Sequence, residues 1–148
     1  DIYDDKLALK IEDEYLERCP KNGLLLHGCL DLLDKISDKY HLSIITNGFE
    51  ETQKLKLQYS GIQHYFNSVF TSESVGTKKP DPAYFDYVIE QLNVKREKCL
   101  VIGDNPMSDI HGGNRSNIDT CWVNTQGFKK KMSSNYYVDN LHQLIKLF

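Results

Sequence analysis

Apolar and polar positions along the chain follow two periods, one typical of helices and one typical of strands. Apolar residues three or four positions apart, such as Leu7, Ile11 and Tyr15, indicate a helix. This period predicts helices over residues 3–18, 30–36, 50–60, 82–92, 107–117 and 139–147. Short apolar runs that end at polar residues or glycine predict strands at residues 42–46, 68–71, 99–103 and 120–123.

Capping and turn-forming residues separate these segments. Asp81 precedes Pro82, which matches an N-cap followed by proline at the first helical position. Gly61 follows the helix predicted over residues 50–60 and can adopt the left-handed conformation that ends a helix. Because strands alternate with helices, we predict an α/β fold with a mostly parallel sheet and helices on both faces. Ligands bind such sheets beyond the carboxyl ends of the strands.

The composition is that of an ordinary globular domain. A length of 148 residues fits one domain, and 40% apolar residues are enough for a core. Lysine and arginine number 18 and aspartate and glutamate 21, which gives a net charge of −3. This balance gives no reason to expect a nucleic acid polymer or a membrane as partner, and the basic run Lys129–Lys131 is interpreted as a solvated loop.

The cysteines and histidines do not form a recognisable metal motif. The cysteine spacings match neither a zinc site nor a Cys-x-x-Cys redox motif. Cys99 and Cys121 lie in apolar runs, where a reduced and buried thiol is expected. This usage indicates a reducing compartment, so we expect a cytoplasmic protein. Surface or packing roles are expected for His27, His41, His64, His111 and His142.

Three predicted strand ends carry residues that could perform chemistry. The first strand is followed by Thr46-Asn47-Gly48, the second by a loop leading to Lys78-Lys79-Pro80, and the third by Asp104 and Asp109. Most of these residues also have a structural explanation, since threonine ends many strands and Asp109 would complement the dipole of the next helix. Asp104 is harder to explain in this way, because a carboxylate directly after a buried strand is costly unless something pairs with it.

Taken together and in this order, the three groups resemble the haloacid dehalogenase superfamily, from about Leu24 to the C-terminus. The stretches ITNG, SESVGTKKPDPAYFDYVIEQL and VIGDNPMSDIHGGNRSNI are similar to its subfamily with a helical cap inserted after the first strand. TNGFEETQKLKLQYSGIQHYF resembles the branch that dephosphorylates pyrimidine and related nucleoside monophosphates. The resemblance implies a Rossmann-like three-layer α/β/α fold and a magnesium-dependent phosphate monoester hydrolase. It also implies an aspartyl-phosphate intermediate and a small phosphorylated metabolite as substrate.

The resemblance also assigns roles to the acidic residues. Asp104 would be a direct or near-direct ligand of Mg²⁺, and Asp109, one turn further on, would hold the metal ion or its waters. This assignment agrees with the preference of Mg²⁺ for carboxylate oxygens together with water and substrate phosphate. A divalent cation between the two acids and the phosphate would explain why the chain tolerates both of them.

The remaining candidates would bind the phosphoryl group. In the resembled family the lysine directly precedes the proline, so Lys79 would offset the carboxylate charge and Lys78 would be a solvated neighbour. The Thr46 hydroxyl and the Asn47 backbone N–H would donate to the phosphoryl group as charge develops, with Gly48 in the same substrate-binding loop.

The first motif of the resembled family, Asp-x-Asp-x-Thr/Ser after an apolar strand, does not occur in this sequence. Its first aspartate is the nucleophile and its second the general acid and base. Residues 1–5 (DIYDD) contain acids but follow no apolar strand, so they do not qualify. We therefore expect residues 1–22 to be the remnant of a helical cap, and residues 23–148 to be a core that lacks its first strand.

We accordingly expect the chain by itself to be inactive, with the missing N-terminal segment or another copy completing the sheet. Two other functions stay open. One is a non-catalytic binding or interaction fragment on a phosphatase fold. The other is a metal-independent dehalogenase, against which the pair of Asp104 and Asp109 argues.

Overall fold

The structure is a computed structural model that describes residues 4–129 and 132–148. Its strands are β1 (Ser43–Thr46), β2 (Ser68–Thr71), β3 (Leu100–Gly103), β4 (Asp119–Val123) and β5 (Tyr136–Val138). Its α-helices are α1 (Asp5–Arg18), α2 (Cys29–Ile36), α3 (Glu50–Tyr59), α4 (Ser72–Val75), α5 (Pro82–Leu92), α6 (His111–Arg115) and α7 (Leu141–Ile145). Short 3₁₀ turns lie at Cys19–Lys21, Gln63–Tyr65 and Arg96–Lys98, and a π-helical turn at Pro106–Ile110.

The strands and most helices lie where the sequence predicted them. The four predicted strands are confirmed, and their ends differ from the prediction by one residue at most. The cap of α5 is also confirmed, because the Asp81 side chain accepts a hydrogen bond from the Ala83 N–H, 3.0 Å away. Residue 3 of the first predicted helix and two lysines of the basic run, Lys130 and Lys131, lie outside the described residues.

Three local predictions were wrong. The single helix predicted over residues 107–117 is a π-helical turn followed by α6. The terminal helix is shorter than 139–147, because the Asn140 side chain caps the Gln143 N–H and fixes its start at Leu141. Strand β5 was not predicted, since three residues with two exposed tyrosines are too few for an alternating pattern.

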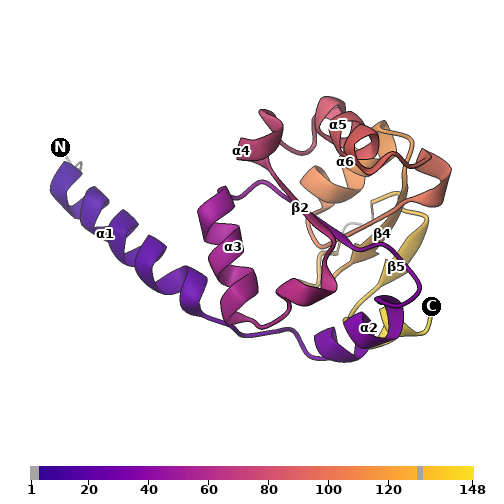
Figure 1. Ribbon diagram of the computed structural model, residues 1–148, viewed down its shortest axis with the longest axis horizontal. Coiled ribbons are helices and arrows are strands. Elements are labelled where there is room, and N and C mark those ends of the chain that lie inside the picture. Colours follow the sequence, from indigo (N-terminus) through magenta and orange to yellow (C-terminus); the bar gives the residue numbers. More distant parts are fainter. Residues whose placement is uncertain (1–3, 130–131) are drawn as a thin grey trace.

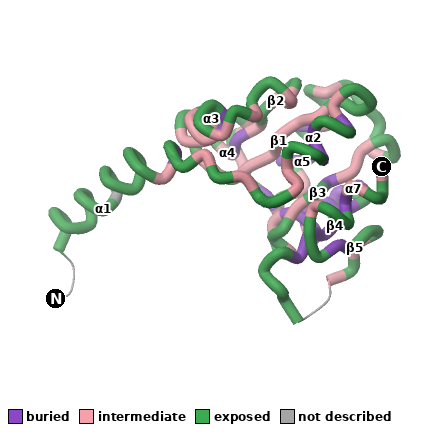
Figure 2. The backbone as a smooth tube through the Cα atoms, turned by 90° about the horizontal axis from the view of Figure 1, so that it is seen from below, coloured by how far each residue is buried: buried purple, intermediate pink, exposed green. Residues whose placement is uncertain are grey.

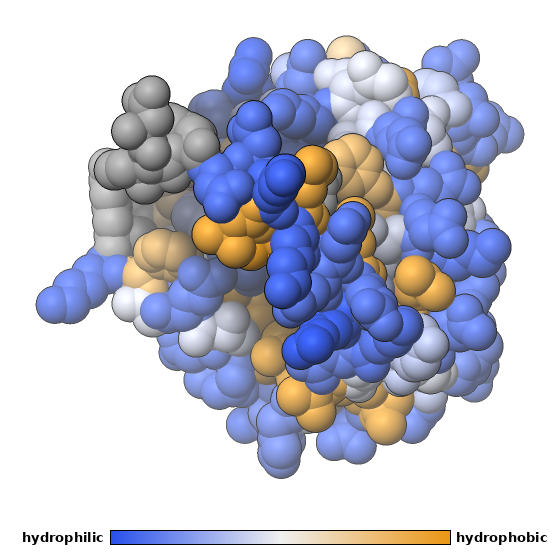
Figure 3. Space-filling view, turned by 90° about the vertical axis from the view of Figure 1, so that its left-hand side faces the viewer, coloured by the Kyte–Doolittle hydropathy of each residue, from blue (hydrophilic) through white to orange (hydrophobic). Residues whose placement is uncertain are grey.

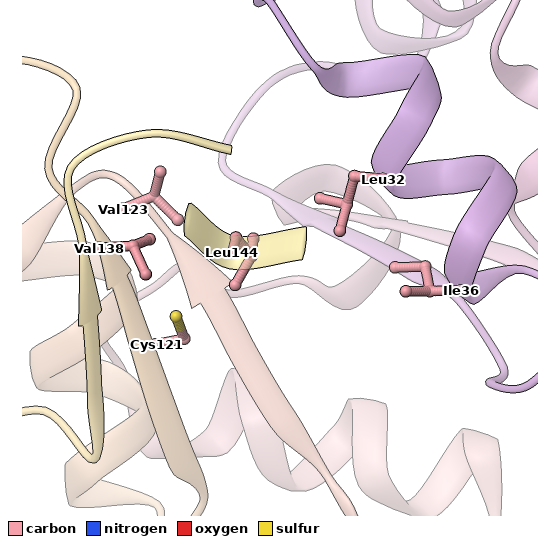
Figure 4. Packing of buried hydrophobic residues seen from close by; sticks show 6 residues of the cluster. All are labelled: Leu32, Ile36, Cys121, Val123, Val138 and Leu144. Atoms are coloured by element: carbon pink, nitrogen blue, oxygen red, sulfur yellow. The ribbon is translucent and has the colours of Figure 1, made fainter. Parts of the chain in front are cut away.

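The fold has three layers, with helices on both faces of parallel strands (Figure 1). Every strand pairing is parallel, between β1 and β2, β3 and β4, and β4 and β5. Helices α2 and α7 cover one face, where their apolar side chains meet those of β4 and β5 (Figure 4). That cluster comprises Leu32, Ile36, Cys121, Val123, Val138 and Leu144.

Helix α5 covers the opposite face. Tyr84, Phe85 and Val88 pack there against Val101 of β3 and against Ile118. Leu100, the neighbour of Val101, packs instead with the α2 and α7 cluster, as the alternating side chains of a strand require. Helix α6 lies close to α5 because it carries glycine at position 112. A Cβ atom there would come within 2.6 Å of the Phe85 ring.

The strands form two separate sheets, β1-β2 and β3-β4-β5. Strand β1 pairs with β2 and strand β3 with β4, while β1 and β3 are not hydrogen-bonded to each other. All four residues of β1 are only half-buried, Ile102 of β3 is 38% exposed, and the buried Ser43 hydroxyl has no partner among the described residues. This division falls between the strands that end at Thr46 and Gly103, where the family resemblance places the absent first strand.

Helix α1 projects away from the rest of the molecule (Figures 1 and 2). Its apolar side chains Leu7, Ile11 and Tyr15 are 53%, 60% and 54% exposed. On this side of the molecule, hydrophobic surface lies between hydrophilic residues (Figure 3). Across residues 4–129 and 132–148, none of the helices has the length and apolar character needed to cross a bilayer.

The cysteines are unpaired thiols. Cys121 is fully buried as expected, and burial raises its pKa to about 11, so the thiol stays protonated at neutral pH. Cys99 is only half-buried, which contradicts the expectation for this residue, because it lies just before β3 rather than within it.

The divided sheet predicts that the 148-residue chain does not form a stable monomer by itself. The free edges of β1 and β3 can associate with edges of other molecules. A central strand would bury about four apolar side chains, and burial of each contributes about 1.5–3 kcal/mol to the free energy of unfolding, about 6–12 kcal/mol together. The chain would lack this contribution, which is comparable to the whole stability of a typical domain, about 5–15 kcal/mol. Analytical ultracentrifugation and thermal melting of the purified chain test this expectation. A monomer with one cooperative melting transition would contradict it.

Candidate active site

The predicted site residues gather where the two sheets meet, at the carboxyl ends of β1 and β3. Thr46 is the last residue of β1 and Gly103 the last residue of β3. Lys79 lies in the loop between α4 and α5 and reaches both strands, because its ammonium contacts a carbonyl of β1 and a carboxylate in the turn after β3. The structure therefore brings the three strand-end groups of the sequence together at one edge.

A buried ion pair joins Lys79 and Asp109. The Lys79 Nζ lies 2.7 Å from the Asp109 Oδ1, and both side chains are 9% exposed. The same ammonium donates a hydrogen bond to the Ile45 carbonyl oxygen, 2.7 Å away. Each buried charge is thus paired and hydrogen-bonded, which a buried ion needs. The Lys79 side chain therefore connects β1 with the turn that follows β3, across the division between the sheets.

The Asp109 carboxylate is held by its own turn as well. The Ser108 hydroxyl donates to its Oδ1 over 3.1 Å, and the Asn105 backbone N–H donates to its Oδ2 over 3.1 Å. The Asn105 side chain stabilises this turn, because its Oδ1 accepts hydrogen bonds from the N–H groups of Met107 and Ser108. Gly103 is required here, since a Cβ atom would lie 2.6 Å from the Asp109 Cγ. Both oxygens of Asp109 are therefore engaged.

The Asn47 side chain fixes the backbone of Lys79. Its Oδ1 accepts from the Lys79 N–H and its Nδ2 donates to the Lys79 carbonyl, each over 2.9 Å. The Lys79–Pro80 peptide that follows is cis. The family resemblance implied a role for the Asn47 backbone N–H and none for its side chain, although a primary amide can pair with both polar groups of one residue's backbone. Asn47 therefore sets where the Lys79 side chain begins.

Thr46 and Lys78, the lysine that precedes Lys79, are more accessible to solvent than Lys79 and Asp109. The half-buried Thr46 hydroxyl accepts from the Gly48 N–H over 3.1 Å, and no described residue accepts its own hydrogen. Lys78 is exposed beside an open hollow of about 450 Å³ and has no ion-pair partner in the described part of the chain. Burial and pairing thus distinguish the two adjacent lysines, and they favour Lys79 as the residue that belongs to the site.

Asp104 has an exposed carboxylate with one oxygen engaged. Its Oδ2 accepts from the Gln126 Nε2 over 3.0 Å, and its backbone carbonyl accepts from the Trp122 Nε1 over 3.2 Å. The fully buried Trp122 anchors the backbone of Asp104. These two contacts could not be predicted from the sequence, since they join Asp104 to residues 18 and 22 positions further along the chain.

The donor chemistry fits Mg²⁺ in part. Asp104 and Asp109 supply the hard oxygen atoms that this ion prefers, and Asp104 has an oxygen left to bind it. Among residues 4–129 and 132–148, however, no group of three or more histidine, cysteine or acidic side chains is arranged to hold a metal ion. A magnesium ion here would take its other ligands from water, from a phosphate or from residues beyond this set.

His27 and His142 stack on each other, with ring centroids 4.6 Å apart.

Comparison with known proteins gives consistent matches. A model of the haloacid dehalogenase-like hydrolase family matches residues 5–123. The pyrimidine 5'-nucleotidase YjjG of Escherichia coli is 33% identical over 141 residues, covering 93% of this chain and 63% of that protein. The pyrimidine 5'-nucleotidase PynA of Streptococcus pneumoniae is 42% identical over 106 residues, covering 70% of this chain and 45% of that protein. The chain thus spans about half to two thirds of these relatives.

A solved structure matches over nearly the whole chain. The crystal structure of the HAD-hydrolase YfnB of Bacillus subtilis, bound to magnesium, superimposes with a TM-score of 0.86 at 33% sequence identity. The match covers 94% of this chain and 61% of that chain. The likeness therefore extends from the motifs to the arrangement of the helices and strands.

Replacing Lys79 should destabilise the fold far more than replacing its neighbour. In the full-length protein, Lys79→Ala leaves the Asp109 carboxylate buried without its cation, at a cost of about 3–5 kcal/mol. Lys78→Ala, the matched control at an exposed position, should change the free energy of unfolding by less than about 0.5 kcal/mol. Urea denaturation measures the free energy of unfolding of both variants. Equal losses in Lys79→Ala and Lys78→Ala would contradict a stabilising role of the ion pair.

Proposed function

The chain belongs to the haloacid dehalogenase-like hydrolase family, and from this we propose that it is the larger part of a magnesium-dependent phosphatase. The proposed reaction is the hydrolysis of a phosphate monoester, with a nucleoside monophosphate or another small phosphorylated metabolite as substrate. The observation that carries the proposal is the buried pair of Lys79 and Asp109 at the carboxyl ends of β1 and β3. Family membership supports an enzyme, and the relatives named pyrimidine 5'-nucleotidases support the choice of substrate class.

The residues of this chain would bind and orient the phosphoryl group. The Thr46 hydroxyl has a hydrogen to donate, and the Asn47 backbone N–H follows it at the end of β1. Donors that are already in place where charge develops lower the barrier of phosphoryl transfer. Lys79 adds a positive charge next to the same edge, held by the Asn47 amide and by Asp109.

The nucleophile would come from outside these 148 residues. We propose an aspartate that attacks phosphorus and forms an aspartyl-phosphate, and a second aspartate that acts as general acid and base. A strand between β1 and β3 would deliver both next to Lys79, because those strands end there. The segment that completes the sheet in this way is the proposed partner of the chain.

Magnesium would be bound on the Asp104 side of the site. The Asp104 carboxylate is exposed and keeps one oxygen available, whereas both oxygens of Asp109 already accept hydrogen bonds. We therefore propose Asp104 as the direct ligand, with Asp109 holding Lys79 and ordering water around the ion. When bound, the ion would supply positive charge that neutralises the phosphate oxygens.

The free thiols suggest where the protein works. All four cysteines are unpaired, and burial raises the pKa of Cys29 and Cys121. Thiols persist in reducing compartments, so we propose a cytoplasmic enzyme.

Magnesium binding tests the assignment of Asp104. In the full-length protein, titration calorimetry should show that Asp104→Asn weakens Mg²⁺ binding by at least about 10-fold, because a carboxylate ligand becomes a neutral amide. The control Asp38→Asn removes the same charge from an exposed position after α2 and should bind Mg²⁺ as the wild type does. Equal affinities of Asp104→Asn and Asp38→Asn would refute the assignment.

Phosphate release by the full-length protein tests the reaction itself. With a nucleoside monophosphate and Mg²⁺, Lys79→Ala should lose roughly 10²–10³ in kcat, the usual effect of removing an electrostatic donor. Lys78→Ala should lose little. Turnover of a haloacid without Mg²⁺ would indicate a dehalogenase instead, and the absence of both activities would indicate a non-catalytic binding protein.

A further inference from the structure

A buried tyrosine hydroxyl joins the ends of β1 and β2. Tyr84 lies in the first turn of α5 and is fully buried. Its hydroxyl oxygen accepts a hydrogen bond from the Thr46 N–H over 3.1 Å, and its hydrogen is donated to the Phe70 carbonyl over 2.6 Å. One side chain therefore satisfies polar groups of both strands at the edge where the candidate active site lies.

The Tyr84 hydroxyl keeps its proton and can therefore donate a hydrogen bond at any physiological pH. Burial raises the pKa of Tyr84 to about 12, so the group stays protonated throughout the physiological pH range. Without it, the Thr46 N–H and the Phe70 carbonyl would lose a partner in the interior, where unpaired polar groups are costly. Packing of the ring does not need the hydroxyl, because phenylalanine would fill the same space among Phe85, Val88 and Val101.

The segment from Lys79 to Tyr84 holds the end of β1 at two consecutive residues. At one end of the segment, the Lys79 backbone is paired with the Asn47 side chain. At the other end, the Tyr84 hydroxyl holds the Thr46 N–H. Thr46 and Asn47 are the two proposed phosphoryl donors, so the segment that carries the lysine also determines their position.

We propose that Tyr84 is a positioning residue of the active site, whose hydroxyl fixes the Thr46 backbone, and through it the adjacent Asn47 N–H, in the geometry needed to bind the phosphoryl group. This inference rests on the proposed function for the role of the two donors. The fixation itself rests on the hydrogen bonds of Tyr84 alone. Tyr84 touches no substrate and acts through Thr46.

The test compares Tyr84→Phe with Tyr87→Phe in the full-length protein. Tyr87 lies on the same helix, is 37% exposed, and its hydroxyl has no hydrogen bond within the described residues. Each substitution removes a single oxygen atom. The first measurement is hydrogen–deuterium exchange of peptides that cover residues 43–48 and, as a reference for the whole fold, β3 and β4.

We expect Tyr84→Phe to speed exchange at residues 43–48 by about 10-fold, with no change in β3 and β4, and Tyr87→Phe to behave like the wild type. Exchange at residues 43–48 equal to that of Tyr87→Phe would overturn the proposal. Faster exchange in all three regions would overturn it too, since the hydroxyl would then support the fold as a whole.

The second measurement is kinetic. Tyr84→Phe should lower kcat by about 10- to 100-fold, because small displacements of donor groups are costly in the transition state. Inhibition by orthovanadate, which adopts the geometry of phosphoryl transfer, should weaken by a similar factor, while the Mg²⁺ affinity stays within about 2-fold. Unchanged kcat and vanadate inhibition would overturn the positioning role even if exchange were faster.

The two measurements separate this inference from the proposed function. If the wild-type protein releases no phosphate, the proposed function fails. Exchange at residues 43–48 then still decides whether the Tyr84 hydroxyl fixes the end of β1.

Discussion

The contact between Lys79 and Asp109 is the interaction on which the rest of the site depends. An ammonium and a carboxylate that are each 9% exposed require one another, because either charge alone would be buried without compensation. The Lys79 ammonium also uses the carbonyl of Ile45, so the pair connects β1 to the turn after β3 although these strands belong to different sheets. The surrounding residues hold the two partners of this ion pair in place. Asn47 fixes the Lys79 backbone, Gly103 leaves space for Asp109, and Asn105 shapes its turn.

The sequence was most informative where one local pattern was enough. The four strands and the start of α5 follow from apolar runs and a capping pair, whereas the choice of Lys79 over Lys78 rested on the family resemblance. What the sequence did not reveal depends on contacts between distant positions. The side chain of Asn47 pairs with a residue 32 positions away, and the Tyr84 hydroxyl with one 38 positions away. No periodicity encodes such contacts. Strand β5 was missed because it forms only by pairing with β4.

The divided sheet and the candidate site are two aspects of one arrangement. Parallel strands place their carboxyl ends at one edge, so a segment between β1 and β3 would end beside Lys79. The same position has unpaired strand edges, a buried Ser43 hydroxyl without a partner among the described residues, and a half-exposed Ile102. A strand inserted there would therefore bury apolar surface and bring new side chains to the site in one step. Stability and catalysis would then depend on the same segment.

The charges of the site explain why a divalent cation suits it. Lys79 is already neutralised by Asp109, and Asp104 adds a second carboxylate, so these three side chains together carry one negative charge. A phosphate monoester brings up to two more negative charges at neutral pH, since its second pKa is about 6. The ammonium of Lys79 cannot attract such a substrate by itself, because its field is largely cancelled by Asp109 at 2.7 Å. A Mg²⁺ ion on Asp104 would change the net charge of these three side chains and the ion from −1 to +1. Lys79 would then offset the charge of Asp109 and hold the strand ends in place, and a bound metal ion would add the further positive charge that a phosphate dianion needs.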